Sequence, residues 1–221
     1  MKKTALILAV ILILSSFVAC GQRPVSYDNL ISKYTELVAC LKDGRELPSR
    51  ENENEKEKAA YDALYAAVES AKENPEDMSY GIKDLNGDGA DELILLSKYL
   101  NVYAVFTPRD GVATPLYDNG CFAVITKDGE FYLHEGALFN TKIQIKKIVN
   151  GELVGDEYGV VSETGTRADA VYYKIENGKR DEITFAEYLS LTDPLANTFS
   201  DYREIIEKIG ITVVPAIKSE N

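Results

Sequence analysis

Residues 79–96 read SYGIKDLNGDGADELILL, and this stretch decides the expected fold. Before it, apolar residues recur every three or four positions, which is the spacing of an amphipathic helix. From Tyr80 and Ile82 onward the spacing changes to two, which is typical of a strand with one buried face. Leu93 to Leu96 then form a short apolar run. The acidic, glycine-rich segment from Asp84 to Glu92 is therefore expected to join two strands.

Two helices are predicted before this stretch, between about residues 27 and 74. The apolar face of the first is formed by Tyr27, Leu30, Ile31, Tyr34, Leu37, Val38 and Leu41. Gly44 is expected to end this helix, because glycine readily adopts the left-handed conformation of a helix terminus. The charged segment 50–58 leads into the second helix, whose apolar positions are Tyr61, Leu64, Tyr65 and Val68.

After the stretch, short apolar segments alternate with turn signals, which predicts an antiparallel meander over about residues 79–175. The turn signals are Arg109-Asp110-Gly111, Lys127-Asp128-Gly129-Glu130, Asn150-Gly151 and Asn177-Gly178. Helices are expected again over about 185–209, the first of them opened by a capping box from Thr184 to Glu187. We predict one α+β domain over residues 27–221, in which N-terminal and C-terminal helices flank the meander.

The segment Asp84–Glu92 carries the clearest chemical pattern of the chain. Calcium prefers several hard oxygen ligands, and a tight loop can bring them together. The loop offers an oxygen ligand at every second position. The predicted ligands are the side chains of Asp84, Asn86 and Asp88 at positions one, three and five, the carbonyl of Ala90 at position seven and the carboxylate of Glu92 at position nine. Gly89 permits the sharp turn between them. We expect a structural calcium ion here.

The loop departs from a complete EF-hand. Its twelfth position is Leu95, where an EF-hand has a bidentate glutamate. Without that ligand we expect weak affinity, with a dissociation constant of about 10⁻⁴–10⁻³ M. The alternative is a metal-free turn, since glycine, aspartate and asparagine form turns without any ion.

The N-terminus has the order of a secretory signal. Two lysines are followed by an apolar run from Ala5 to Leu14 and then by Phe17-Val18-Ala19-Cys20. The run is too short for a membrane span of about 20 residues. We predict a lipoprotein signal peptide over residues 1–19, lipidation at Cys20, a tether over residues 20–26, and a location outside the cytoplasm on the cell membrane. The alternative is an uncleaved anchor helix with an incidental cysteine.

The charge of the chain excludes one class of partner. The full chain has a net charge of −12, and removal of residues 1–19 leaves 22 basic against 36 acidic residues, a net charge of −14. An acidic protein repels nucleic acid and anionic headgroups. The predicted partners are therefore the membrane, through the lipid, and a protein or glycan ligand, with no nucleic acid.

No catalytic motif is recognisable. His134 is the only histidine, so a histidine-based metal site is excluded, and no glycine-rich phosphate loop or nucleophile elbow occurs. Cys40 and Cys121 can form a disulfide outside the cytoplasm or remain two separate thiols. The 36 acidic residues offer many carboxylate pairs, and nothing selects one of them for hydrolysis.

The order of these features resembles that of uncharacterised lipoproteins of anaerobic Gram-positive bacteria, closely in the loop Asp84–Leu93 and loosely elsewhere. The loop is also similar to the short calcium loops of dockerins and of integrin-type repeats. The resemblance implies a location and an architecture but no activity. We expect a non-enzymatic, calcium-stabilised binding or scaffold module at the cell surface. The alternatives are an accessory lipoprotein of an envelope complex and a hydrolase with unidentified carboxylates.

Overall fold

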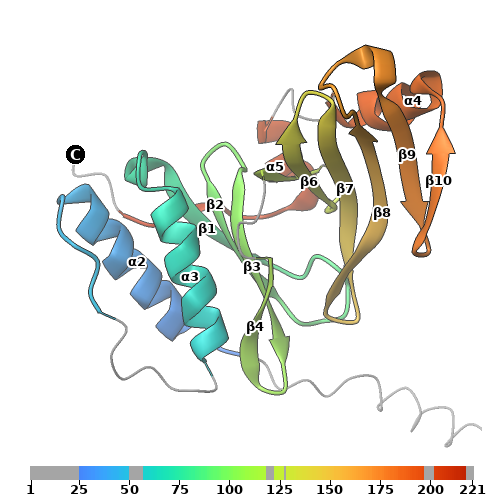
Figure 1. Cartoon of the computed structure of the whole chain (residues 1–221). Helices are drawn as coiled ribbons and strands as arrows, with labels where there is room; N and C mark the ends of the chain where they lie inside the picture. Colours follow the sequence, from blue (N-terminus) through green and yellow to red (C-terminus); the bar gives the residue numbers. More distant parts are fainter. Residues whose placement is uncertain (1–24, 50–56, 118–121, 127, 197–201, 218–221) are drawn as a thin grey trace, which may run out of the picture.

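Two antiparallel sheets make up most of the molecule. The computed structural model describes residues 25–49, 57–117, 122–126, 128–196 and 202–217 (Figure 1). Sheet A contains, in spatial order, β11 (Val214–Pro215), β1 (Met78–Lys83), β2 (Glu92–Ser97), β3 (Val102–Arg109) and β4 (Val112–Tyr117). Sheet B contains, in spatial order, β10 (Lys179–Ile183), β9 (Val171–Glu176), β8 (Glu152–Val161), β7 (Asn140–Val149), β6 (Phe131–Ala137) and β5 (Phe122–Ile125).

Helices cover part of each sheet. In Figure 1, α2 (Asp28–Lys42) and α3 (Lys58–Ser70) lie side by side against sheet A. The helix α4 (Phe185–Ala196) packs against β8 and β9 of sheet B. A fourth helix, α5 (Tyr202–Ile209), precedes β11, and two short 3₁₀ turns cover Pro75–Asp77 and Arg167–Asp169. The predicted α+β class is confirmed.

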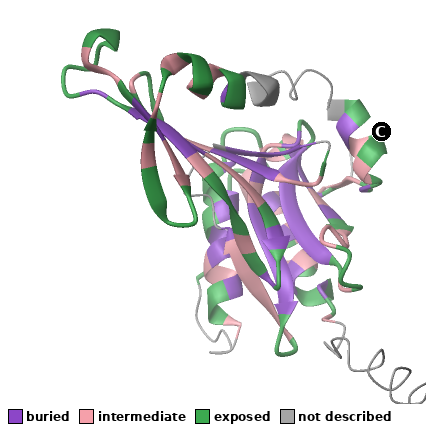
Figure 2. Ribbon diagram, turned by 90° about the vertical axis from the view of Figure 1, so that its right-hand side faces the viewer, coloured by how far each residue is buried: buried purple, intermediate pink, exposed green. Residues whose placement is uncertain are grey.

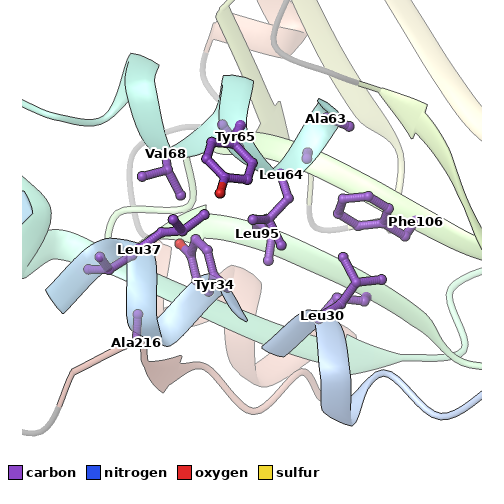
Figure 3. Close-up of a cluster of buried hydrophobic side chains, with 14 of the residues drawn as sticks. Leu30, Tyr34, Leu37, Ala63, Leu64, Tyr65, Val68, Leu95, Phe106 and Ala216 are labelled. Atoms are coloured by element: carbon purple, nitrogen blue, oxygen red, sulfur yellow. The ribbon is translucent and has the colours of Figure 1, made fainter. Parts of the chain in front are cut away.

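The first hydrophobic core lies between α2, α3 and one face of sheet A. Figure 3 shows Tyr34 of α2 and Leu64 of α3 directed toward Leu95 of β2. These three side chains are fully buried, and the Tyr34 hydroxyl donates a hydrogen bond to the Ser79 carbonyl at 3.1 Å. The apolar faces read from the helical spacing are thus the faces that pack on the sheet.

The second core joins the two sheets. Ile94 of β2 and Val105 of β3 pack with Phe131 and Ile148 of sheet B, and Ile205 of α5 completes this cluster. Strand β2 is therefore buried on both faces, since its odd-numbered leucines meet the helices and its even-numbered residues meet sheet B. This explains why Leu93 to Leu96 form a continuous apolar run instead of an alternating one. In Figure 2 the buried residues are concentrated in the strands between the layers.

The local turn predictions agree with the backbone. Asp110-Gly111, Asn150-Gly151 and Asn177-Gly178 each have two successive positive φ angles, between 52° and 79°. Such pairs form the tight turns that match strand twist. At the start of α4, the Glu187 amide donates to the Thr184 hydroxyl at 3.2 Å, and the Thr184 amide donates to the Glu187 carboxylate at 2.7 Å. This is the predicted capping box.

The prediction of one meander was wrong in two respects. The strands divide into two sheets between β4 and β5, with an isolated bridge from Asn101 to Val124 connecting them. Strands also continue beyond the predicted end at residue 175, since β10 pairs with β9 and β11 pairs with β1. An alternating pattern predicts which face of a strand is buried, but it does not reveal whether the next strand continues the same sheet.

Several predictions fall on residues outside the described ranges. The signal peptide over 1–19, the lipidation site Cys20, most of the tether over 20–26 and the thiol of Cys121 belong to this group. Cys40 is buried on α2 as a free thiol. Within the described ranges, no helix is both long enough and apolar enough to cross a membrane.

Candidate metal centre

The predicted calcium loop connects β1 to β2 and is shaped by the side chain at its first position. The Asp84 carboxylate accepts the Gly87 amide at 2.7 Å and the Gly89 amide at 2.9 Å, one on each oxygen. Gly87 and Gly89 have φ angles of 74° and 87°, a conformation that other residues rarely adopt. The backbone therefore curls around the Asp84 carboxylate.

The side chains at the third and fifth positions also accept amides of the loop backbone. The Asn86 side-chain oxygen accepts the Asp88 amide at 2.9 Å, and one oxygen of Asp88 accepts the Ala90 amide at 2.8 Å. The other Asp88 oxygen accepts the Asn86 side-chain NH₂ at 3.0 Å. The backbone of the loop thus holds three predicted ligand side chains in place. Each of their oxygens uses one lone pair for a hydrogen bond and has another lone pair left.

The ninth position differs from the others because it is fully buried. Glu92 is the first residue of β2, and its side chain is inaccessible to solvent. One carboxylate oxygen accepts the Leu85 amide at 2.9 Å, and the other accepts the Thr107 hydroxyl at 3.2 Å. Burial raises the pKa of Glu92 to about 7, the two hydrogen bonds oppose this rise, and the negative charges of Asp88 and Asp84 add to it. The charges of Asp84 and Asp88 thus disfavour the ionised form of Glu92.

Three residues that the sequence did not point to hold the loop in place. The Tyr27 hydroxyl donates to the Asp91 carbonyl at 2.9 Å and also lies 3.3 Å from the Phe106 carbonyl. Burial raises the pKa of Tyr27 above its ordinary value, so this donor remains protonated. Thr107 supports Glu92, and Leu85 packs against the core between the sheets. Tyr27 and Thr107 are distant from the loop in sequence, and no local motif marks them.

The donor set fits calcium in its chemistry. All predicted ligands offer hard oxygen atoms, and the charges of Asp84, Asp88 and Glu92 are of the sign that a divalent cation would neutralise. Among the described residues, no group of three or more His, Cys, Asp or Glu side chains is arranged so that these alone could hold a metal ion. Asp84, Asp88 and Glu92 are therefore not arranged as such a group, and the predicted set would need Asn86 and the Ala90 carbonyl as further ligands.

The loop borders a hollow of about 590 Å³ at one end of sheet B. Figure 1 shows the β1–β2 loop extending toward the turn between β7 and β8. Asn86 and Asp88 line the hollow from one side, while Asp128, Lys147 and Asn150 line it from the turns of sheet B. Ion pairs from Lys147 to Glu130 and from Lys208 to Asp128 reinforce this region. The loop is therefore placed where it can influence how the two sheets meet.

His134 and Cys40 lie in different layers of the described structure, and Cys121 falls outside the described residues. His134 lies on β6 opposite Phe122 of β5, and its ring stacks with Tyr132 at 6.5 Å between ring centres. Cys40 is buried on α2, in the layer on the far side of sheet A. Glu92 is the one described carboxyl group for which a raised pKa is resolved, and its side chain is fully buried.

Comparison of the chain with protein-family models, with curated proteins and with solved structures finds no match in any of the three.

Proposed function

We propose that this chain is a non-enzymatic binding module, anchored by lipid at the outer face of the cell membrane and stabilised by calcium in the β1–β2 loop. One observation supports the calcium most strongly. The loop arranges the side chains of Asp84, Asn86 and Asp88 around its own backbone amides, and the Glu92 carboxylate accepts the Leu85 amide of the same loop. A turn that only connects two strands does not require so many oxygen donors.

The role assigned to calcium is structural. Two hydrogen bonds fix the end of the loop. Tyr27, just before α2, donates to the Asp91 carbonyl, and Thr107 of β3 donates to the Glu92 carboxylate. Leu85, inside the loop, packs on the core that sheet A shares with sheet B. A bound ion would therefore stabilise the junction of the helical layer and both sheets, and would offset the repulsion that Asp84 and Asp88 exert on Glu92.

Calcium is expected to raise the thermal unfolding midpoint of the mature chain by about 3–10 °C at ten to a hundred times the dissociation constant. Asp88→Ala is expected to abolish this rise, because it removes a charged ligand. Thermal unfolding followed by circular dichroism in chelator, in magnesium and in millimolar calcium measures the effect. Asp91→Ala is the matched control, since Asp91 is an exposed aspartate of the same loop outside the predicted ligand set. Equal midpoints in chelator and calcium would contradict the proposal.

Cys20→Ala is expected to move the protein from the membrane fraction to the soluble fraction, because the residue that carries the acyl chains is lost. Cell fractionation with immunoblotting measures the distribution, and the mass of the mature N-terminus identifies the lipid. Cys40→Ala is the control and should remain in the membrane, since that thiol is buried inside the domain. Retention of Cys20→Ala in the membrane would instead indicate an uncleaved N-terminal anchor.

A further inference from the structure

A second hollow, distinct from the β1–β2 loop, lies between the edge strand β4 and the face of sheet B that packs on sheet A. Its volume is about 420 Å³, within the range of small-molecule sites. Leu116 of β4, Leu133 of β6 and Leu153 of β8 contribute apolar lining. The polar and charged side chains of the lining include Arg109, Glu135, Gln144, Lys146 and Glu152. The hollow thus combines an apolar surface with a few polar side chains, as ligand sites do.

Lys146 is the unusual member of this lining. It is half-buried and has neither an ion pair nor a side-chain hydrogen bond among the described residues. Its cross-strand neighbours are Phe131 on β6 and Gly155 on β8, and neither offers a negative charge. A Cβ at Gly155 would collide with the Ile145 carbonyl, so this position of β8 excludes any side chain that would neutralise Lys146.

The acidic residues nearby are already engaged. Glu135 pairs with Lys142 at 2.7 Å, and Glu152 lies 3.5 Å from Arg109. The Glu157 carboxylate accepts the Gln144 side-chain amide at 2.8 Å. In a chain of net charge −12, Lys146 is therefore the one charged side chain of this lining that has no ion pair among the described residues, and three leucines lie in the same lining. A ligand with one negative group and an apolar body would complement both features.

We infer that the hollow between β4 and sheet B binds a small organic anion, a carboxylate with an apolar body, with Lys146 as the residue that pairs with the carboxylate. Leu116, Leu133 and Leu153 contact the apolar body, and the Gln144 side chain is placed to donate a second hydrogen bond. This inference rests on the proposed binding role and gives it a ligand class. It does not depend on calcium.

The test is a titration of the ¹⁵N-labelled mature chain with hexanoate and, separately, with hexan-1-ol, followed by amide chemical shifts. Hexanoate is expected to shift the amides of Leu133, Lys146 and Leu153 saturably, with a dissociation constant on the order of 1 mM. Hexan-1-ol should bind at least about fivefold more weakly, because it lacks the charge. N-acetylleucine tests whether the natural carboxylate belongs to a peptide or to a free acid. Tighter binding than hexanoate indicates the carboxyl end of a peptide, and weaker binding indicates a free acid.

Lys146→Met keeps the aliphatic stem and removes the charge, and it should weaken hexanoate binding at least about fivefold. Lys147→Met is the matched control, since Lys147 is adjacent on β7, points to the opposite face and pairs with Glu130. Hexanoate affinity that is equal in wild type and Lys146→Met, or the lack of saturable shifts up to about 20 mM, would overturn the inference. Titrations in chelator and in calcium separate this result from the calcium proposal.

Discussion

Gly155→Ala is expected to lower the free energy of unfolding by about 3 kcal/mol, equivalent to about 6–12 °C in the unfolding midpoint. Gly155 lies on β8, near the middle of sheet B, and an added Cβ would meet the backbone carbonyl of Ile145 on the neighbouring strand. A backbone atom of a central strand moves only with its whole strand, so the collision cannot be relieved locally. Chemical denaturation followed by circular dichroism measures the loss.

Gly159→Ala on the same strand is the matched control. Here the added Cβ would meet the ring of Tyr173, a side chain that can move aside. The displaced ring would also lose its contact with Arg180, whose guanidinium lies 3.9 Å from the ring centre. We expect a loss of about 1 kcal/mol. Equal losses of unfolding free energy in the two variants would contradict the expectation that the backbone collision at Gly155 costs more than the side-chain collision at Gly159.

Glu92→Gln is expected to have opposite effects in chelator and in calcium. In chelator at pH 8 the unfolding midpoint should rise by about 3–6 °C, because a fully buried charge is replaced by a neutral group of the same shape. The amide oxygen still accepts from Leu85, and the Thr107 hydroxyl can accept from the new NH₂ group. In calcium the ion-dependent rise should be lost, since a charged ligand is gone.

The pH dependence provides a check on the same variant. The pKa of Glu92 in the folded chain is about 7, above its ordinary value of 4.5, so the folded state holds this proton more tightly. The resulting stabilisation is complete below about pH 4.5 and is lost as the pH rises through about 7. In chelator, the advantage of Glu92→Gln over wild type should therefore grow between about pH 5 and pH 8. Glu130→Gln is the control, and an advantage that does not change with pH would contradict the buried-charge explanation.

The sequence predicted those parts of the fold that depend on local chemistry. Asn150-Gly151 forms a tight turn because both residues tolerate a positive φ, and Thr184 and Glu187 cap a helix because each satisfies the other's backbone amide. Asp84, Asn86 and Asp88 were singled out from their spacing, and each accepts a backbone amide of the same loop, while their role as calcium ligands stays a prediction. In each case the residues that interact lie within a few positions of one another.

Features that depend on distant parts of the chain were not predictable in this way. The pairing of Val214–Pro215 with β1 involves only two residues, too few to show any periodicity. The separation of the strands into two sheets follows from how the layers pack on β2, and no single strand encodes it. Tyr27 reaches Asp91 across 64 positions, and Lys146 becomes an isolated charge only when Phe131 and Gly155 flank it.

The most direct test of a calcium-stabilised loop is a calcium titration of the ¹⁵N-labelled mature chain, observed at the amides of Gly87, Gly89 and Ala90. These amides donate to the Asp84 and Asp88 carboxylates, so they report any ion that those carboxylates bind. We predict saturating shifts that share one dissociation constant of about 10⁻⁴–10⁻³ M, with magnesium at least tenfold weaker. Unchanged amide shifts up to about 10 mM calcium would contradict the proposal and identify the loop as a metal-free turn.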